Sequence, residues 1–161
     1  MSYLADFQIK DLIKKGDIKI DPYFETFHGP NLYYCHLGNR FLIPKTNLPK
    51  TVNPLEVKPN DLYDEVVTDE PIIIKSGGFI LAEAFEYLGS SEEYVIRLFN
   101  SSSLARIGVS QAAIGMINPG CGYEKPVKLT LELINNFPTD VVLTPTVIKS
   151  NGEIKWGTEV L

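Results

Sequence analysis

Short runs of alternating apolar residues, separated by turn residues, occur along most of this chain. The clearest run is KLTLEL at residues 128–133, in which every second residue is leucine. Such alternation is typical of a strand with one buried face. Glycine-containing turn signals separate the runs, for example SGG at residues 76–78 and SNG at residues 150–152. Many short strands at regular spacing predict a mainly β chain, built as a sandwich, a jelly roll or a distorted barrel.

Two stretches favour helix instead. Apolar residues recur close to helical spacing in residues 4–13, and Gly16 follows, so we expect an N-terminal helix that ends at this glycine. The run SSSLAR at residues 101–106 resembles the entry to one short inner helix, because serine is favoured at the N-cap.

Two longer apolar stretches are expected to form strands. One covers residues 32–44 and contains a Gly-Asn turn. The other covers residues 108–117 and runs into the turn Asn118-Pro119-Gly120.

The composition describes an ordinary globular protein, and we expect a single domain over residues 1–161. Hydrophobic residues make up 44% of the chain and charged residues 22%, and the net charge of -5 argues against a general nucleic-acid binder. No apolar run reaches the roughly 18 residues of a membrane span. Acidic residues interrupt the first helical pattern, so we expect no signal peptide. The two cysteines cannot form a disulfide framework, which favours a reduced, cytoplasmic protein.

The spacing of a catalytic zinc site is missing. Zinc-dependent deaminases combine a His or Cys with a Pro-Cys-x-x-Cys pair and a Glu. This chain offers only His28, His36, Cys35 and Cys121, without that spacing. We therefore expect no metal ligands in this chain. His36 is interpreted as a structural or surface residue rather than a catalytic one.

Groups suited to an anion converge in the run SSSLARIGV at residues 101–109. Arg106 follows Ser102 by four residues, close to one helical turn of about 3.6 residues. Serine hydroxyls, free backbone N–H groups and a guanidinium suit a phosphate or a developing oxyanion. The same residues also describe an ordinary N-capped turn with a surface arginine, and composition alone favours that simpler interpretation.

Glu132 lies on the polar side of the strand predicted for residues 128–133. On a half-buried strand such a side chain is normally solvated. The functional alternative is a general base that is held near Arg106 and shielded from bulk water.

Three runs in order carry a resemblance to a known family. SSSLARIGV, INPG at residues 117–120 and LTLELINN at residues 129–136 together resemble the dCTP deaminase and dUTPase family. The opening IKDLIKKGDIKIDP, residues 9–22, is similar to the deaminase side of that family. The resemblance implies a dUTPase-like β-clip fold with an N-terminal helix and one short inner helix. It also implies a homotrimer with active sites between subunits, acting on dCTP or dUTP.

The resemblance also implies roles for single residues. Glu132 matches the catalytic Glu, which would take a proton from the water that attacks cytosine C4 and pass protons to N3 and the leaving amine. Arg106 would steady charge beside it, and Ser102 would position the water. Ser102 and Ser103 would hold phosphates, with Mg²⁺ carried by the triphosphate. The predicted nucleotide site comprises Ser101, Ser102, Ser103, Arg106, Gly115, Ile117, Asn118 and Tyr123.

Several residues depart from the family pattern. Asn118 replaces the Asp of Ile-Asp-Pro-Gly, and an amide can hydrogen-bond the sugar but cannot act as a base. Ser101 stands where family deaminases often have Arg or Lys. Tyr34 and His36 replace the charged residues of Asp-x-Arg-Leu-Gly. Gly115, in contrast, matches dUTPases and bifunctional enzymes. We also expect no glycine-rich C-terminal lid.

The leading prediction is a zinc-independent dCTP deaminase that forms dUTP and ammonia and supplies dUTP for thymidylate synthesis. The alternatives are a dUTP diphosphatase, or one protein that performs both reactions. A non-catalytic nucleotide-binding regulator on the same fold is a further alternative, and a purely structural trimeric β domain is the least favoured.

Overall fold

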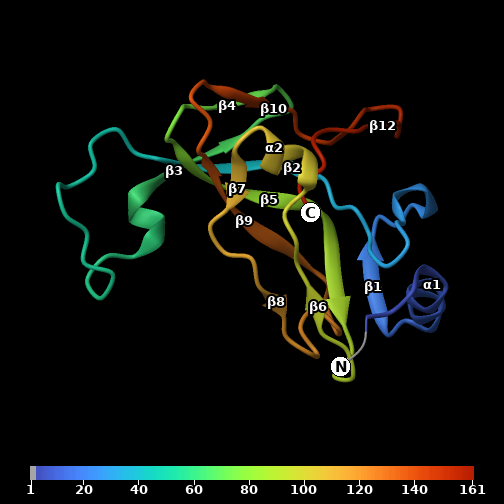
Figure 1. Cartoon of the computed structure of the whole chain (residues 1–161). Helices are drawn as coiled ribbons and strands as arrows, with labels where there is room; N and C mark the ends of the chain where they lie inside the picture. The colour runs from blue at the N-terminus through green and yellow to red at the C-terminus, as the bar shows by residue number, and fades with distance from the viewer. Residues whose placement is uncertain (1–2) are drawn as a thin grey trace.

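A six-stranded antiparallel sheet forms the centre of the protein in a computed structural model that describes residues 3–161 (Figure 1). Its path is β3-β2-β5-β9-β7, and β1 pairs with the far end of the long strand β5. The strands are β1 (Ile18–Asp21), β2 (Leu37–Pro44), β3 (Tyr63–Val67), β5 (Phe79–Ser90), β7 (Val109–Gln111) and β9 (Val127–Asn135).

Three two-stranded ribbons surround this sheet. Figure 1 shows the ribbon β4–β10 at one end of the long sheet and the ribbon β6–β8 at the other. The third ribbon, β11–β12, lies close to the end of the chain. The strands are β4 (Ile72–Ile74), β6 (Ile96–Arg97), β8 (Met116–Ile117), β10 (Val141–Leu143), β11 (Val147–Ile148) and β12 (Ile154–Lys155).

Both predicted helices are present. α1 (Asp6–Lys15) begins with an acidic residue and ends with lysines, as the helix dipole favours. Gly16 follows with φ of 84°, a left-handed conformation that glycine adopts without strain, so the predicted stop is confirmed. α2 (Ser102–Arg106) is the short inner helix, and two 3-10 helices cover Glu25–Phe27 and Pro59–Leu62. None of the helices described in residues 3–161 is long and apolar enough to cross a membrane.

The core lies between one face of the central sheet and the ribbon β4–β10. Alternation along β9 creates this face, because Leu131 and Leu133 are 0% exposed while Thr130 is exposed. Burying a leucine stabilises the fold by about 1.5–3 kcal/mol. Leu104 of α2 also packs into this cluster and anchors the short helix on the sheet. A second cluster, around Cys35, Leu88 and Ile117, lies under the ribbon β6–β8.

The expected Gly-Asn turn at Gly38-Asn39 is wrong. β2 runs straight through these residues, and its register with β5 shifts between Leu37 and Phe41. A Cβ atom on Gly38 would lie 3.0 Å from the carbonyl oxygen of Glu83. Glycine is therefore needed here for the close approach of two strands rather than for a turn.

The expected single strand over residues 108–117 is also wrong. β7 ends at Gln111, and after Ala112 the chain leaves the central sheet to form β8, which pairs with β6. Residues 112–115 offer small side chains and one isoleucine, Ile114, that remains 56% exposed. They bring no apolar anchor that would hold the segment against the core.

Candidate active site

The serine run enters α2 from a buried position. Ser101 is the N-cap, but its hydroxyl does not cap the helix and donates instead to Oε1 of Glu159 at 3.2 Å. Its backbone N–H donates to the carbonyl oxygen of Val160 at 3.1 Å, and the residue is only 4% exposed. Ser101 is thus engaged with the C-terminal segment, and a contact of its hydroxyl with phosphate stays a prediction.

The remaining polar residues of the run face outward. Ser102, Ser103 and Arg106 are all exposed, while Leu104 between them is buried. A five-residue helix held by one apolar anchor thereby presents two hydroxyls and a guanidinium to solvent. These groups can donate hydrogen bonds to a phosphate group.

Glu132 occupies the middle of β9 opposite Leu81 of β5. Its carbonyl oxygen accepts a hydrogen bond from the N–H of Ala112 at 2.7 Å, which fixes the backbone on both sides. The side chain is half-buried and lies on the face opposite the leucine core, beside Thr130 and Ile134 in the alternation of the strand. A carboxylate in this position is neither fully solvated nor paired with a cation in the described part of the chain.

Arg106 and Glu132 lie on different elements of the single chain. α2 leads directly into β7, and β7 pairs with β9, so one strand separates the elements that carry them. No hydrogen bond or ion pair joins the two side chains within residues 3–161. Their approach to one another, which the sequence predicts, stays a prediction.

β8 and the turn after it carry the next predicted residues. Ile117 is buried and pairs with Ile96 of β6, and the carbonyl oxygen of Gly115 accepts a hydrogen bond from the N–H of Leu98 at 3.0 Å. Asn118 is exposed, and its backbone oxygen accepts a hydrogen bond from the N–H of Cys121 at 3.1 Å, while its side chain makes none with the described residues. The Asn118 amide is therefore available to a ligand.

Tyr123 is held by a lysine that the sequence did not indicate. The ammonium of Lys19, on β1, donates to the carbonyl oxygen of Tyr123 and lies 4.7 Å from the centre of its ring. Gly122 lies against Gly89, where an added Cβ would come within 2.1 Å of the Gly122 carbonyl oxygen. The loop after β8 is thus fixed on the β1–β5 pair through a lysine and two glycines.

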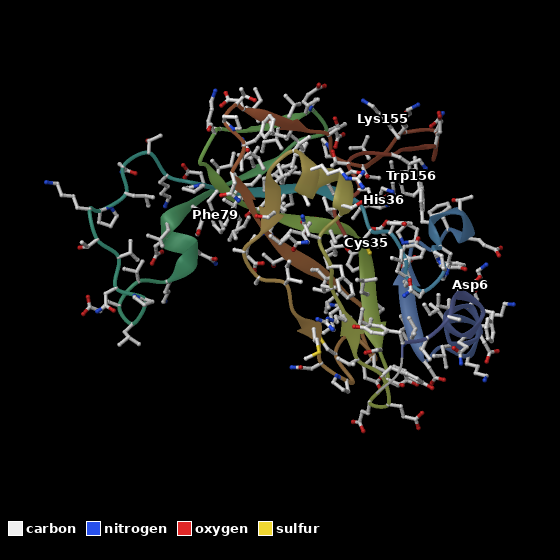
Figure 2. The ribbon with its side chains drawn as sticks, viewed as in Figure 1. Asp6, Cys35, His36, Phe79, Lys155 and Trp156 are labelled. Carbon is white, nitrogen blue, oxygen red and sulfur yellow. The ribbon has the colours of Figure 1, made fainter. Side chains whose placement is uncertain are left out.

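A buried pair with Glu86 explains the departure at His36. Nδ1 of His36 lies 2.8 Å from Oε1 of Glu86, and the His36 backbone N–H donates to Oε2 at 2.8 Å. The rings of Phe27 and Trp156 pack against the imidazole, with centres 4.3 and 4.8 Å away. Figure 2 shows Trp156 and His36 close together. This arrangement fits the structural role predicted for His36. Glu86 was not identified from the sequence, because it lies 50 residues from His36 in the chain.

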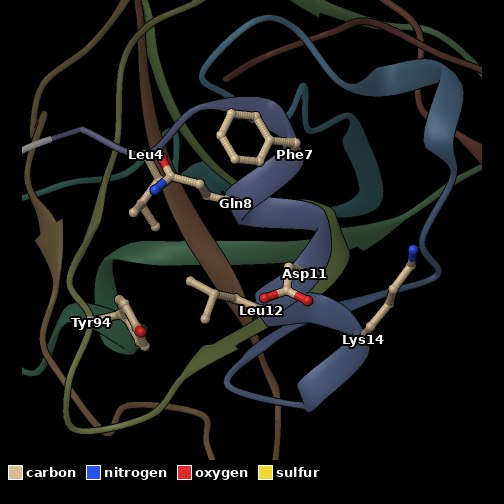
Figure 3. Close-up of a pocket in the computed structure, with 7 residues that line it drawn as sticks. All are labelled: Leu4, Phe7, Gln8, Asp11, Leu12, Lys14 and Tyr94. Atoms are coloured by element: carbon tan, nitrogen blue, oxygen red, sulfur yellow. The ribbon is translucent and has the colours of Figure 1, made fainter.

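Two hollows lie on the α1 side of the molecule. One, of about 460 Å³, is bounded by α1 and Tyr94 (Figure 3). The other, of about 570 Å³, lies over the second apolar cluster and includes Met116 of β8. Cys35 lines it, and burial raises the pKa of this thiol well above its ordinary value, which keeps the sulfur unreactive. Glu132, Arg106 and Ser102 line neither hollow.

Metal-binding side chains are scattered. Across the described residues, no group of three or more His, Cys, Asp or Glu side chains is arranged to hold a metal ion.

Comparison with known proteins places the chain in a family. The dCTP deaminase-like family matches residues 3–148. The protein named dCTP deaminase, dUMP-forming, from Nanoarchaeum equitans is 32% identical over 158 residues, covering 88% of this chain and 78% of that protein. The protein of the same name from Methanopyrus kandleri is 31% identical over 152 residues, covering 90% and 77%.

A solved structure supports the fold. The 2'-deoxycytidine 5'-triphosphate deaminase from Agrobacterium tumefaciens superposes with a TM-score of 0.65 over 98% of this chain, at 15% sequence identity. This chain spans 45% of the length of that protein chain. The likeness confirms the predicted mainly β, dUTPase-like architecture. The chain belongs to the dCTP deaminase-like family.

Proposed function

We propose that this protein binds dCTP and hydrolytically deaminates its cytosine, with Glu132 as the proton shuttle. The observation that carries the proposal is the position of Glu132, a half-buried carboxylate on β9 in a chain of this family. Relatives about one third identical are named dCTP deaminases, which supports the substrate and the reaction.

The chemistry requires one group that both takes and gives protons. Water forms a bond to cytosine C4 as Glu132 removes one of its protons, and the carboxyl group delivers this proton to N3. Glu132 then takes the remaining proton from the new C4 hydroxyl group and gives it to the amine as the C4 carbonyl forms. The C4–N4 bond breaks, and ammonia leaves. Help of this kind is worth about 10²–10⁴ in rate when the carboxyl group is oriented and partly dry. Half-burial on a strand fixed by two neighbours supplies both conditions.

Other residues would bind and orient the nucleotide. Ser102 and Ser103, both exposed on α2, would donate hydrogen bonds to the phosphates, and Mg²⁺ would arrive as part of the substrate. Ser102 would also orient the attacking water. The free amide of Asn118 would meet the sugar hydroxyl, and the guanidinium of Arg106 would steady the negative charge near Glu132.

The site would be completed by a neighbouring subunit of a homotrimer. Among the described residues no hydrogen bond or ion pair joins Arg106 to Glu132, and the outer face of the sheet around Glu132 remains partly open. Phe79, Leu81 and Ile134 on this face are only half-buried, although they are apolar. Association over this face would bury them and shield the carboxylate from bulk water.

The product proposed is dUMP rather than dUTP. The names of the relatives describe dUMP-forming enzymes, which favours deamination and diphosphate release in one protein. Asn118 stands where the family has an acid, and an amide cannot activate a water. We therefore assign pyrophosphate release as the slower of the two steps. Either nucleotide would serve the supply of deoxyuridine nucleotides for thymidylate synthesis.

Product analysis tests this proposal. The purified protein is incubated with dCTP and Mg²⁺, and ammonia, pyrophosphate, dUTP and dUMP are measured together over time. The proposal predicts ammonia and dUMP, with transient dUTP because pyrophosphate release is the slower step. Pyrophosphate release from dUTP without ammonia from dCTP indicates a diphosphatase. Tight dCTP binding without any product indicates a regulator, and both of these outcomes contradict the proposal.

A further inference from the structure

The C-terminal residues reach the serine run although they lie outside the matched part of the family. The match ends at residue 148, and residues 149–161 follow it. They form β12 and then insert Trp156 among the rings of Phe24, Phe27, His36 and Phe85. The segment is therefore a packed part of the fold.

Backbone hydrogen bonds extend this packing to Ser101. The N–H of Leu37 donates to Thr158 at 2.8 Å, and the N–H of Val160 donates to Cys35 at 2.9 Å. Val160 is 0% exposed in the main core and accepts the hydrogen bond from the Ser101 N–H. Residues 158–160 are thus fixed between β2 and the entrance to α2.

Glu159 lies within this fixed stretch and brings a negative charge to the serine run. Its Oε1 accepts the hydroxyl hydrogen of Ser101 at 3.2 Å, and the side chain is half-buried. Within the described residues, no Lys, Arg or His nitrogen lies within 4.0 Å of this carboxylate. The charge is therefore not neutralised by a partner. It stands next to Ser101, the N-cap residue of α2.

We propose that Glu159 is a specificity-determining residue that weakens binding of the nucleotide in proportion to its phosphate charge. This inference rests on the proposed function, because it takes Ser102 and Ser103 as the phosphate-binding residues. Ser101 adjoins both, so bound phosphates would lie within about 10 Å of Glu159, near the screening distance at about 0.1 M salt. Like charges at that separation repel, and the repulsion grows with each added phosphate. The KM for dCTP is raised as a result, while a monophosphate is affected much less.

Glu159→Gln tests the proposal because glutamine retains an oxygen acceptor for the Ser101 hydroxyl and removes only the charge. Binding of Mg²⁺-dCTP and of dUMP is measured by titration calorimetry at about 0.05 M and about 0.5 M salt. The variant should bind dCTP roughly three- to tenfold more tightly at low salt. The gain should fall below about twofold at high salt, and dUMP should gain less than about twofold.

Glu153→Gln is the matched control. Glu153 belongs to the same C-terminal segment but pairs with Lys149 at 2.9 Å, and its neutralisation should leave dCTP affinity unchanged. Thermal melting checks the fold of each variant. If Glu159→Gln does not fold, Glu159→Ala is used, with the same direction expected.

Equal affinity of wild type and variant for dCTP at low salt overturns the inference, as does a gain that is equal for dUMP and insensitive to salt. Ammonia release is measured separately on both proteins. If neither releases ammonia while the variant binds dCTP more tightly, the proposed reaction fails and the role of Glu159 stands. If both release ammonia and bind equally, only the role of Glu159 fails.

Discussion

The carboxylate of Glu86 and the imidazole of His36 form a pair that is almost entirely shielded from water, at 0% and 4% exposure. Nδ1 of His36 and Oε1 of Glu86 are 2.8 Å apart, and the other carboxylate oxygen accepts a hydrogen bond from the backbone N–H of His36. Glu86 lies where β5 shifts its register against β9, and His36 lies just before β2. The pair therefore links β5 to the start of β2 at a point where the regular pairing of β5 with β9 is interrupted.

Removal of the Glu86 carboxylate should destabilise the fold strongly. Glu86→Ala leaves the His36 ring and N–H buried without a partner, and the loss of one member of a buried pair costs about 3–5 kcal/mol. The free energy of unfolding is measured by urea titration. Glu65→Ala removes an exposed carboxylate that pairs with Arg40, and no measurable change is expected. Equal stability of the two variants would contradict this assignment.

His28 should make stability fall in mild acid. The centre of its ring lies 5.5 Å from that of Tyr23 and 5.4 Å from that of Tyr33, and both ring nitrogens are buried without a hydrogen bond to any described residue. Burial lowers the pKa of His28 below its ordinary value near 6.5. The folded state thus binds fewer protons than the unfolded chain. The contribution to stability is complete above about pH 6.5 and is lost as the pH falls through the lower folded-state pKa.

The measurement compares wild type with His28→Phe between about pH 7.5 and pH 5. The variant keeps an aromatic ring but has no titrating nitrogen, so its free energy of unfolding should fall less with acid. Parallel curves for both proteins would show that His28 does not cause the acid sensitivity.

The residue at position 118 should set the rate of pyrophosphate release. Asn118→Asp places a carboxylate of nearly the same shape on an exposed turn, where the Asn118 side chain makes no hydrogen bond to the described residues. A base in this position should raise pyrophosphate release from dUTP about tenfold or more. Ammonia release from dCTP should change less than about twofold, and it serves as the internal control. No gain in pyrophosphate would show that another step limits this reaction.

The loop that carries Tyr123 should depend on Gly122. This residue has φ of 69°, and an added Cβ would lie 2.3 Å from the carbonyl oxygen of Leu88. Gly152 is a matched control, because its φ is 81° but nothing lies within 4 Å of an added Cβ. Both alanine variants suffer the left-handed backbone strain of about 1–2 kcal/mol. Gly122→Ala should lose about 1–3 kcal/mol more in a urea titration. Equal losses of unfolding free energy in the two variants would contradict a close approach of Gly122 to the Leu88 backbone.

Features that depend on local pattern could be predicted from the sequence. Alternating leucines identified β9 and placed Glu132 on its outer side, and Gly16 marked the end of α1. Many short strands at regular spacing indicated the mainly β architecture, and the three family runs indicated its dUTPase-like form. These signals are strong because periodicity and turn chemistry act over a few neighbouring residues.

Features that depend on distant contacts could not be predicted in this way. Gly38 has the appearance of a turn glycine, but it accommodates the backbone of Glu83 on another strand. Ser101 has the appearance of a phosphate ligand, but its hydroxyl binds Glu159, 58 residues later in the chain. Neither partner is visible in a local window, since tertiary packing determines both.

Replacement of Glu132 by glutamine tests the central claim most directly. Glu132→Gln keeps the shape of the side chain but cannot shuttle a proton, while Glu124→Gln neutralises an exposed carboxylate and serves as the control. Ammonia release from dCTP is followed together with dCTP affinity. We predict that Glu132→Gln lowers ammonia release by about 10²–10⁴ and leaves dCTP affinity within about threefold, whereas Glu124→Gln changes neither. Ammonia release by Glu132→Gln at the wild-type rate would contradict the account.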